Sequence, residues 1–169
     1  ERCFEATGHT CFICDFSPPR AGDPALLAPA ADLDVDFISV AYNPGRAVRV
    51  SAAMLAAAIR QQVGKEVVFT LATRDMNKLA LQSQLLGAQL LGLQNVVVVQ
   101  GDPFSERDLV QVKAVADFTP SQLIASIAKM NQGEDYRSSQ LRAPTDFCIG
   151  ATVDLGRGIR REARLAHRK

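Results

Sequence analysis

Acidic and polar side chains follow the predicted strands of this sequence, each at the point where a strand ends. They are Asp15, Tyr42, Asn43, Thr73, Arg74, Asp75, Gln100, Asp102 and Asp154, with Gly101 between Gln100 and Asp102. In parallel α/β folds the carboxyl ends of the strands meet at one edge, and that edge holds the reactive groups. Carboxylates beside hydroxyl and amide groups suit a site that binds a neutral or cationic heterocycle and handles protons. A metal ion held by carboxylates is the competing interpretation, because hard cations prefer oxygen ligands.

The stretch N-V-V-V-V-Q-G-D-P at residues 95–103 predicts a strand that is buried on both faces and ends abruptly in a turn. Asp102 therefore comes just past the carboxyl end of a strand. Because Gly, Asp and Pro all favour turns, simple turn formation is the alternative role for this aspartate.

Cysteines and histidines are weaker candidates for chemistry. Cys11 and Cys14 form a C-x-x-C pair, which is typical of metal and redox sites. They lie in a strand-like run, however, where side chains three positions apart point to opposite faces. We expect all four cysteines to be buried, reduced thiols. His9 and His167 lie far from the predicted strand ends, which argues against a Ser-His-Asp triad or a histidine-based metal site.

Five strands and the helices between them position these side chains. Strands are predicted at residues 10–16, 36–42, 66–73, from 95 onwards, and 146–154. Helices are predicted at 51–64, 76–91, 119–130 and 158–169, and 23–33 is expected to be a short or broken helix. Asp75 is the expected cap of the helix at 76–91, and Thr119 opens a capping box. The irregular, polar residues 104–118 form a candidate lid or binding loop.

Strand and helix alternate five times without a hairpin signal, which predicts a parallel sheet with crossover helices. An open doubly wound sheet suits a chain of 169 residues. A complete (β/α)8 barrel needs about 250 residues, so this chain would supply only part of one.

Composition limits the classes of function. The net charge of +1 implies no general attraction to nucleic acid. The sequence lacks a dinucleotide-binding G-x-G-x-x-G after its first strand and a P-loop. Without an apolar run of about 20 residues or a signal-like start, we expect no membrane association and a cytoplasmic location. By length, residues 1–169 are expected to form a single domain.

Several runs of residues together resemble one enzyme family. They include C-D-F-S-P-P-R at 14–20, F-I-S-V-A-Y-N-P-G-R at 37–46, T-L-A-T-R-D-M-N at 70–77, L-G-L-Q-N-V-V-V-V-Q-G-D-P at 91–103 and F-T-P-S-Q-L-I-A-S-I at 118–127. In order and spacing they resemble the methylenetetrahydrofolate reductase family. The resemblance implies an α/β fold that is a (β/α)8 TIM barrel, of which this chain supplies about the first five βα units.

The resemblance also implies a reaction and its residues. The family reduces 5,10-methylenetetrahydrofolate to 5-methyltetrahydrofolate by hydride transfer from reduced FAD, with NAD(P)H as electron donor, in the one-carbon metabolism that serves methionine biosynthesis. Asp15 matches the family's acid, and Asp102 matches the aspartate that lies against flavin and folate. The cofactor side would be lined by Tyr42, Thr70, Thr73, Gln100, Gly101, Asp102, Ala151 and Arg168. No metal is implied, and a homo-oligomer or a partner subunit is expected.

Two alternatives belong to other classes. Gln100 stands where the family has an arginine, and other flavin-side positions also differ. The first alternative is therefore a flavin-free folate-binding or methyl-transfer subunit that acts with a partner protein. The second is a structural half-barrel without its own activity, which would tend to dimerise because one face stays uncovered.

Overall fold

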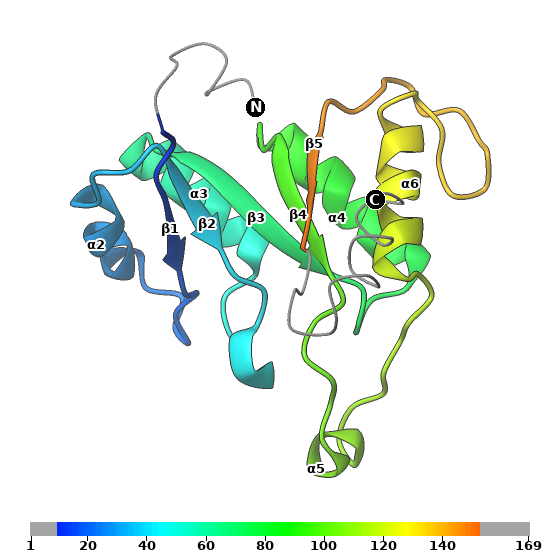
Figure 1. Ribbon diagram of the computed structural model, residues 1–169, viewed down its shortest axis with the longest axis horizontal. Coiled ribbons are helices and arrows are strands. Elements are labelled where there is room, and N and C mark those ends of the chain that lie inside the picture. Colours follow the sequence, from blue (N-terminus) through cyan, green and yellow to red (C-terminus); the bar gives the residue numbers. More distant parts are fainter. Residues whose placement is uncertain (1–9, 153–169) are drawn as a thin grey trace. The chain divides into compact units, whose positions relative to one another are not determined.

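The structure, a computed structural model, describes residues 10–152 and contains two compact units (Figure 1). The first unit ends at Thr70 and the second begins at Leu71. The strands are β1 (Ile13–Phe16), β2 (Phe37–Val40), β3 (Glu66–Ala72), β4 (Asn95–Val99) and β5 (Cys148–Ala151). Their order is β1-β2-β3-β4-β5, with parallel pairing of β1 with β2, β2 with β3, and β4 with β5. The predicted α/β fold with a parallel sheet is confirmed.

The described part of the first unit contains three short helical segments in its loops. They are η1 (Pro24–Leu27), α2 (Ala28–Ala31) and η2 (Pro44–Arg46). The Asp23 side chain accepts a hydrogen bond from the Ala25 amide at 2.9 Å and so caps η1. Pro29 lies in the first turn of α2, immediately after the 3-10 turn. The short, broken helix that this proline predicted is confirmed.

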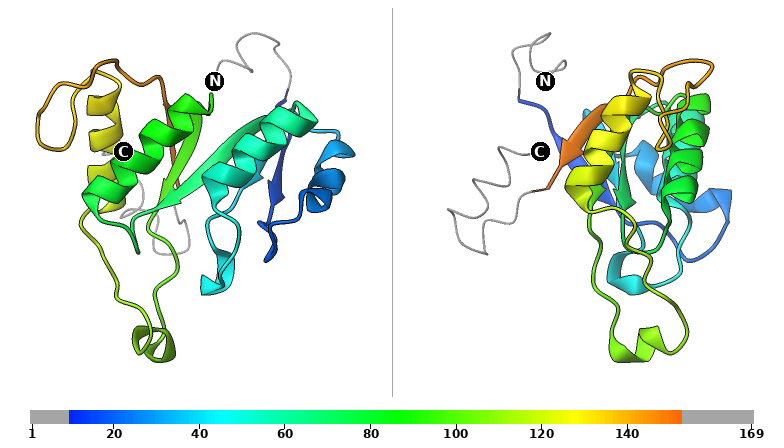
Figure 2. Two further views of the ribbon diagram at one scale, coloured as in Figure 1. Left: turned by 180° about the vertical axis from the view of Figure 1, so that it is seen from behind. Right: turned by 90° about the vertical axis from the view of Figure 1, so that its right-hand side faces the viewer.

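Helix α3 (Ala52–Val63) covers the strands of the first unit. Seen from behind, it lies in front of them (Figure 2, left). Ala53, Ala56 and Ile59 are fully buried on this helix, and Ile38 and Val40 are fully buried on β2. Small side chains thus let the helix approach the sheet closely, and Gly64 ends it in the left-handed conformation with φ 73°.

The second unit has its own core. α4 (Lys78–Leu90) and α6 (Pro120–Met130) lie on the same side of β5, as Figure 2 (right) shows, and α5 (Glu106–Leu109) is a single turn in the loop after β4. Leu81 and Leu85 of α4, Val98 of β4, and Leu123 and Ile127 of α6 are all fully buried. The capping box predicted at Thr119 is confirmed, with both reciprocal hydrogen bonds present.

The structure corrects the expected burial of β4. Val96 and Val98 are buried, whereas Asn95, Val97 and Val99 are only half-buried. The reason is that the helices of this unit pack on one face of the strand. Four β-branched residues in a row therefore alternate in burial instead of being enclosed on both sides.

The cap of α4 is also corrected. Asn77, not Asp75, is the N-cap, and its Oδ1 accepts a hydrogen bond from the Ala80 amide at 2.8 Å. Asp75 instead binds the guanidinium of Arg74 and pairs with Val115 in an isolated parallel bridge. This tertiary contact takes the carboxylate away from the helix.

The cysteines are free thiols, but they are not buried as predicted: Cys11 and Cys14 are half-buried and Cys148 is exposed. Cys14 on β1 and Cys148 on β5 lie on the end strands in the sheet order, and Cys11 precedes β1, which explains the exposure. Other predictions lie outside the described residues, namely those for Cys3, His9, Asp154, His167, Arg168 and the basic helix at 158–169. Across residues 10–152, the helices are all too short or too polar to cross a bilayer.

Candidate functional site

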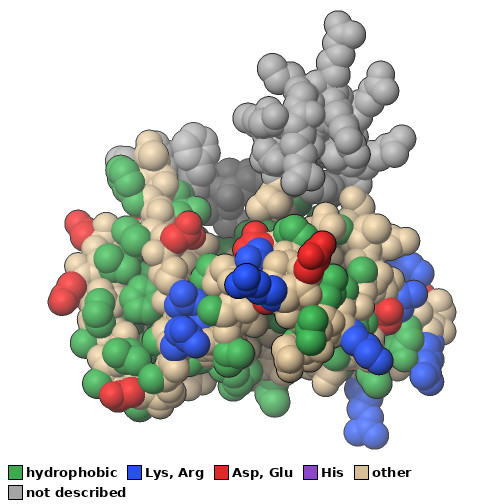
Figure 3. Space-filling view, turned by 90° about the horizontal axis from the view of Figure 1, so that it is seen from below, with side chains coloured by type: hydrophobic (Ala, Val, Ile, Leu, Met, Phe, Trp, Pro, Cys, Tyr) green, Lys and Arg blue, Asp and Glu red, His purple; other side chains and the backbone are tan. Residues whose placement is uncertain are grey.

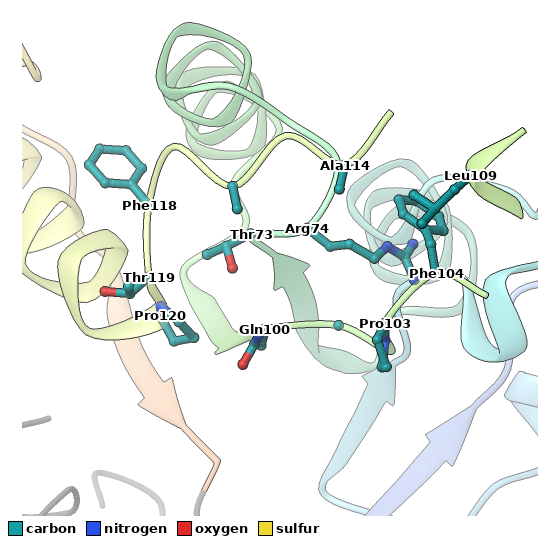
Figure 4. Close-up of a pocket in the computed structure, with 12 residues that line it drawn as sticks. Thr73, Arg74, Gln100, Pro103, Phe104, Leu109, Ala114, Phe118, Thr119 and Pro120 are labelled. Atoms are coloured by element: carbon teal, nitrogen blue, oxygen red, sulfur yellow. The ribbon is translucent and has the colours of Figure 1, made fainter. Parts of the chain in front are cut away.

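A pocket of about 340 Å³ opens at the carboxyl ends of β3 and β4 in the second unit (Figure 4). Its lining residues are Thr73, Arg74, Gln100, Gly101, Pro103, Phe104, Leu109, Ala114, Ala116, Phe118, Thr119 and Pro120. Specific ligand sites are commonly concave and mostly apolar, with a few convergent polar groups. The pocket has this character, and it lies at the edge where strand-end chemistry was expected.

Two apolar walls face each other across the pocket. Phe104 and Leu109 lie on one side, and Pro120 lies on the other, beside the backbone of Phe118, whose ring points away from the pocket (Figure 4). The hydroxyl of Thr73 and the amide of Gln100 lie between them. An aromatic ring on one side and a proline face on the other, with hydrogen-bonding groups between, suit a planar heterocycle with polar edges.

The floor of the pocket depends on a close approach between the ends of β3 and β4. The Thr73 amide donates to the Val99 carbonyl at 3.1 Å, which ties the two strand ends together. Gly101 has φ +86°, and a Cβ built there would lie 3.2 Å from the Ala72 Cβ and 3.3 Å from the Arg74 Cβ. Only glycine combines this backbone conformation with this spacing. The turn therefore places Gln100 and Asp102 on either side of a glycine that cannot carry a side chain without strain.

The second wall is fixed by the start of α6. The Phe118 ring is buried, with the Lys78 ammonium 5.1 Å from its centroid. The Lys78 amide donates to the Asp117 carboxylate at 3.2 Å. Thr119 and the Pro120 that follows it open the helix, as the sequence predicted. These contacts hold Phe118 and Pro120 at the pocket.

Three of the predicted site residues meet in this pocket: Thr73, Gln100 and Gly101. Asp102 follows them directly with an exposed side chain, and its carbonyl accepts a hydrogen bond from Arg74 at 3.0 Å. Ala151, exposed at the end of β5, does not line the pocket.

The remaining predicted residues belong to the first unit. Asp15 lies on β1 with an exposed side chain, in register with Ser39 of β2. Tyr42 follows β2 and is half-buried, and Thr70 is half-buried on β3. Beside Tyr42, the Asn43 Oδ1 oxygen is buried and has no hydrogen-bond partner among the described residues. This oxygen is an acceptor that a bound ligand can satisfy.

Sequence reasoning missed the walls of the pocket. It marked residues 104–118 as a binding loop but did not single out Phe104 or Phe118, and it placed Arg74 at a strand end without giving it a role. The usable signal was their position, since all three follow a strand end or flank the loop. Arg74 had an additional signal, because a cation directly after an apolar strand must find partners where it is buried.

Charge on one face of the molecule is mixed. In the surface view of Figure 3, acidic, basic and hydrophobic side chains are interspersed. Within residues 10–152, no cluster of three or more His, Cys, Asp or Glu residues could hold a metal ion. The described pocket thus offers hydrogen-bonding and apolar contacts, and Arg74 is the only charged residue among those that line it.

A model of the methylenetetrahydrofolate reductase family matches residues 2–142 of the chain. The chain belongs to the methylenetetrahydrofolate reductase family. No curated protein matches the sequence. Membership indicates an oxidoreductase of folate one-carbon metabolism, and the methylenetetrahydrofolate reductase match includes every residue that lines the pocket.

Proposed function

We propose that the protein reduces 5,10-methylenetetrahydrofolate to 5-methyltetrahydrofolate with a bound flavin. The observation that carries this proposal is the pocket at the ends of β3 and β4, with apolar side chains on two sides and the polar groups of Thr73 and Gln100 between them, inside the part of the chain that matches the family. Fold alone would not indicate a reaction. The proposal therefore depends on what these side chains can bind and orient.

The pocket suits the ring system of a flavin better than a whole dinucleotide. Its volume of about 340 Å³ is at the low end for ligand pockets. A planar ring would lie between Phe104 and Pro120, with Thr73 and Gln100 at its polar edge. Tyr42, Thr70, Ala151 and Arg168 would contact other parts of FAD, as in the family. FAD, reloaded by NAD(P)H, would supply the hydride.

The two aspartates would act on the folate. Asp15 would be the proton donor that helps to open the five-membered ring of the substrate. Asp102 would orient the substrate and, through its charge, tune the flavin. A general acid acts at hydrogen-bond distance, so the shorter aspartate in place of the family's glutamate must approach the substrate more closely or act through one water.

We further propose that the two units are parts of a single domain, the first five βα units of a (β/α)8 barrel. The support is local: in each unit the strands are parallel and a helix covers one face of them. The catalytic edge of such a barrel is the carboxyl end of its strands. A cytoplasmic location and a homo-oligomer or partner subunit complete the proposal.

The first test is the visible absorption spectrum of the intact protein, followed by release of the cofactor on heating. A flavin spectrum, and reductase activity with NADH or NADPH, are expected. Asp15→Asn should then lower kcat at least about 100-fold, because general acid catalysis contributes 10²–10⁴. Asp34→Asn is the matched control, since Asp34 is an exposed carboxylate before β2. Equal activity of the Asp15 variant and the control would refute the role of Asp15.

A flavin-free folate-binding subunit is the second candidate. The observation that favours it is the neutral, exposed side chain of Gln100, where the family has an arginine. Protein that stays colourless after incubation with FAD, but binds tetrahydrofolate in a calorimeter, would support this candidate. Absence of folate binding in that protein would refute it.

A further inference from the structure

Arg74 is a charged residue at the base of the pocket, yet it is only 8% exposed. Its guanidinium makes three kinds of contact at once. Nη2 lies 2.7 Å and Nε 3.3 Å from the same Asp75 carboxylate oxygen, Oδ2. Nη1 donates to the Asp102 carbonyl at 3.0 Å, and the guanidinium carbon lies 4.5 Å from the centroid of the Phe104 ring. Figure 4 shows the side chain extended toward Phe104 along the floor of the pocket.

The same residue also holds the far end of the loop that follows β4. The Val115 amide donates to the Arg74 carbonyl at 2.9 Å, and Asp75 pairs with Val115. The side chain of Arg74 therefore fixes the loop at Asp102 and Phe104, and its backbone fixes it at Val115. Both ends of the loop are thus in contact with Arg74.

Between these anchor points the loop contains hydrogen bonds of its own. Its helical turn α5 is closed by a capping box in which Ser105 and Asp108 bind each other. Leu109, Val110 and Val112 are exposed large apolar side chains. Leu109 and Phe104 nevertheless line the pocket. The position of this wall thus depends on the anchor points more than on contacts along the loop.

We propose that Arg74, with Asp75 as its counter-ion, is a positioning residue that sets the Asp102 backbone and the Phe104 wall of the pocket. It acts through these two residues, because the bonds from its Nε, Nη1 and Nη2 atoms are directed at Asp75 and Asp102 and not into the pocket. The effect of this role on catalysis rests on the proposed function. Its effect on the loop can be measured without any ligand.

The guanidinium is required for a geometric reason. It is planar, so it can donate in two directions in its own plane while its face stacks on a ring. A lysine at this position would keep the charge but would contact Asp75 or Asp102, not both with stacking. The positioning role therefore predicts that Arg74→Lys behaves more like Arg74→Gln than like the native protein.

The experiment uses the intact protein and two exposed trypsin sites in the loop, Arg107 and Lys113. Cleavage at these bonds, followed by mass spectrometry, reports the open population of the loop. Arg74→Gln and Arg74→Lys should each raise the cleavage rate about tenfold or more, since hydrogen bonds from a charged donor are the stronger ones. Arg60→Gln is the matched control, because Arg60 lies outside the loop and pairs with the exposed Glu66 at a longer distance, 3.8 Å. Unchanged cleavage in both Arg74 variants would overturn the proposal.

A double variant distinguishes two effects of losing Arg74: loss of the loop's position, and loss of the ion pair with Asp75. Arg74→Gln alone leaves the Asp75 carboxylate uncompensated, whereas Arg74→Gln with Asp75→Asn does not. If the role is positioning, the double variant should regain thermal stability but keep fast cleavage of the loop. Native cleavage rates in the double variant would show that Arg74 only balances the charge of Asp75.

Ligand binding gives the final test, with FAD as the probe. Titration by quenching of FAD fluorescence should show at least about tenfold weaker binding to Arg74→Lys than to the native protein, with Arg60→Gln unchanged. If native protein and the Arg74 variants bind FAD equally well, the positioning role is wrong. If the native protein binds no FAD, the proposed flavin function fails, while the cleavage result still decides whether Arg74 positions the loop.

Discussion

Replacing Gly101 by alanine should damage both the stability of the second unit and its pocket. The residue has φ +86°, a conformation that costs an L-amino acid about 1–2 kcal/mol. The new methyl group would also lie 3.2 Å from the Ala72 Cβ and 3.3 Å from the Arg74 Cβ. Both neighbours are attached directly to the backbone and cannot rotate away, so overpacking adds about 1–2 kcal/mol. The expected loss is about 2–4 kcal/mol.

Gly133 provides a matched control for this prediction. It has the same φ of +86°, but the nearest atom to a methyl group added there is the Gln140 side-chain oxygen at 3.9 Å. Gly133→Ala should therefore lose only the conformational term, about 1–2 kcal/mol. The difference between the free energies of unfolding of the two variants therefore measures the cost of the close contact between residue 101 and the end of β3.

Urea unfolding followed by circular dichroism measures both variants, with the slope of the transition checked for two-state behaviour. Binding of FAD by each folded variant is measured in parallel. Gly101→Ala should weaken FAD binding, and Gly133→Ala should leave it unchanged. Equal free energies of unfolding for the two variants would refute the packing argument at Gly101.

Three further predictions concern single contacts in the second unit. Thr119→Ala should cost about 1 kcal/mol in urea unfolding through loss of the α6 cap, and Thr119→Ser should restore it. Gly150→Ala should lower the melting temperature, because its Cβ would lie 2.9 Å from a methyl of Val97; Val97→Ala in the same chain should relieve the clash. A hydrogen bond from Ser138 lowers the pKa of the Glu134 carboxyl. The small stabilisation by the ionised carboxylate should therefore be lost as pH falls through that lowered pKa. Acid unfolding of Glu134→Gln that is identical to that of the native protein would contradict this.

The sequence was most informative where structure is decided locally. Thr119, Pro120 and Gln122 specify a capping box by their spacing alone, and the structure contains it. Gly64 ends α3 because few other residues adopt its left-handed backbone. The order of strands and helices, and hence the parallel α/β fold, followed from the same kind of signal.

Prediction failed where tertiary contacts compete with local preference. Asp75 and Asn77 are both good helix caps, and the sequence does not show that Arg74 binds Asp75. The four valines after Asn95 do not show which faces of β4 are covered, because that depends on where α4 and α6 pack. The same limit applies to the site: strand ends predicted Thr73, Gln100 and Gly101, but the aromatic wall at Phe104 comes from a loop whose path is set by Arg74.

The part-buried ion pair of Arg74 with Asp75 supports a geometric role on energetic grounds. Burial of the Arg74 charge carries a desolvation cost, and a well-packed apolar pair of the same volume is often at least as stable. The Arg74–Asp75 contact at 2.7 Å is therefore a poor explanation for the stability of this unit. An apolar pair would not donate to the Asp102 carbonyl or stack on Phe104 in a defined plane. The guanidinium therefore fixes the orientation of its partners. These partners are the turn that carries Asp102 and the Phe104 ring at one wall of the pocket.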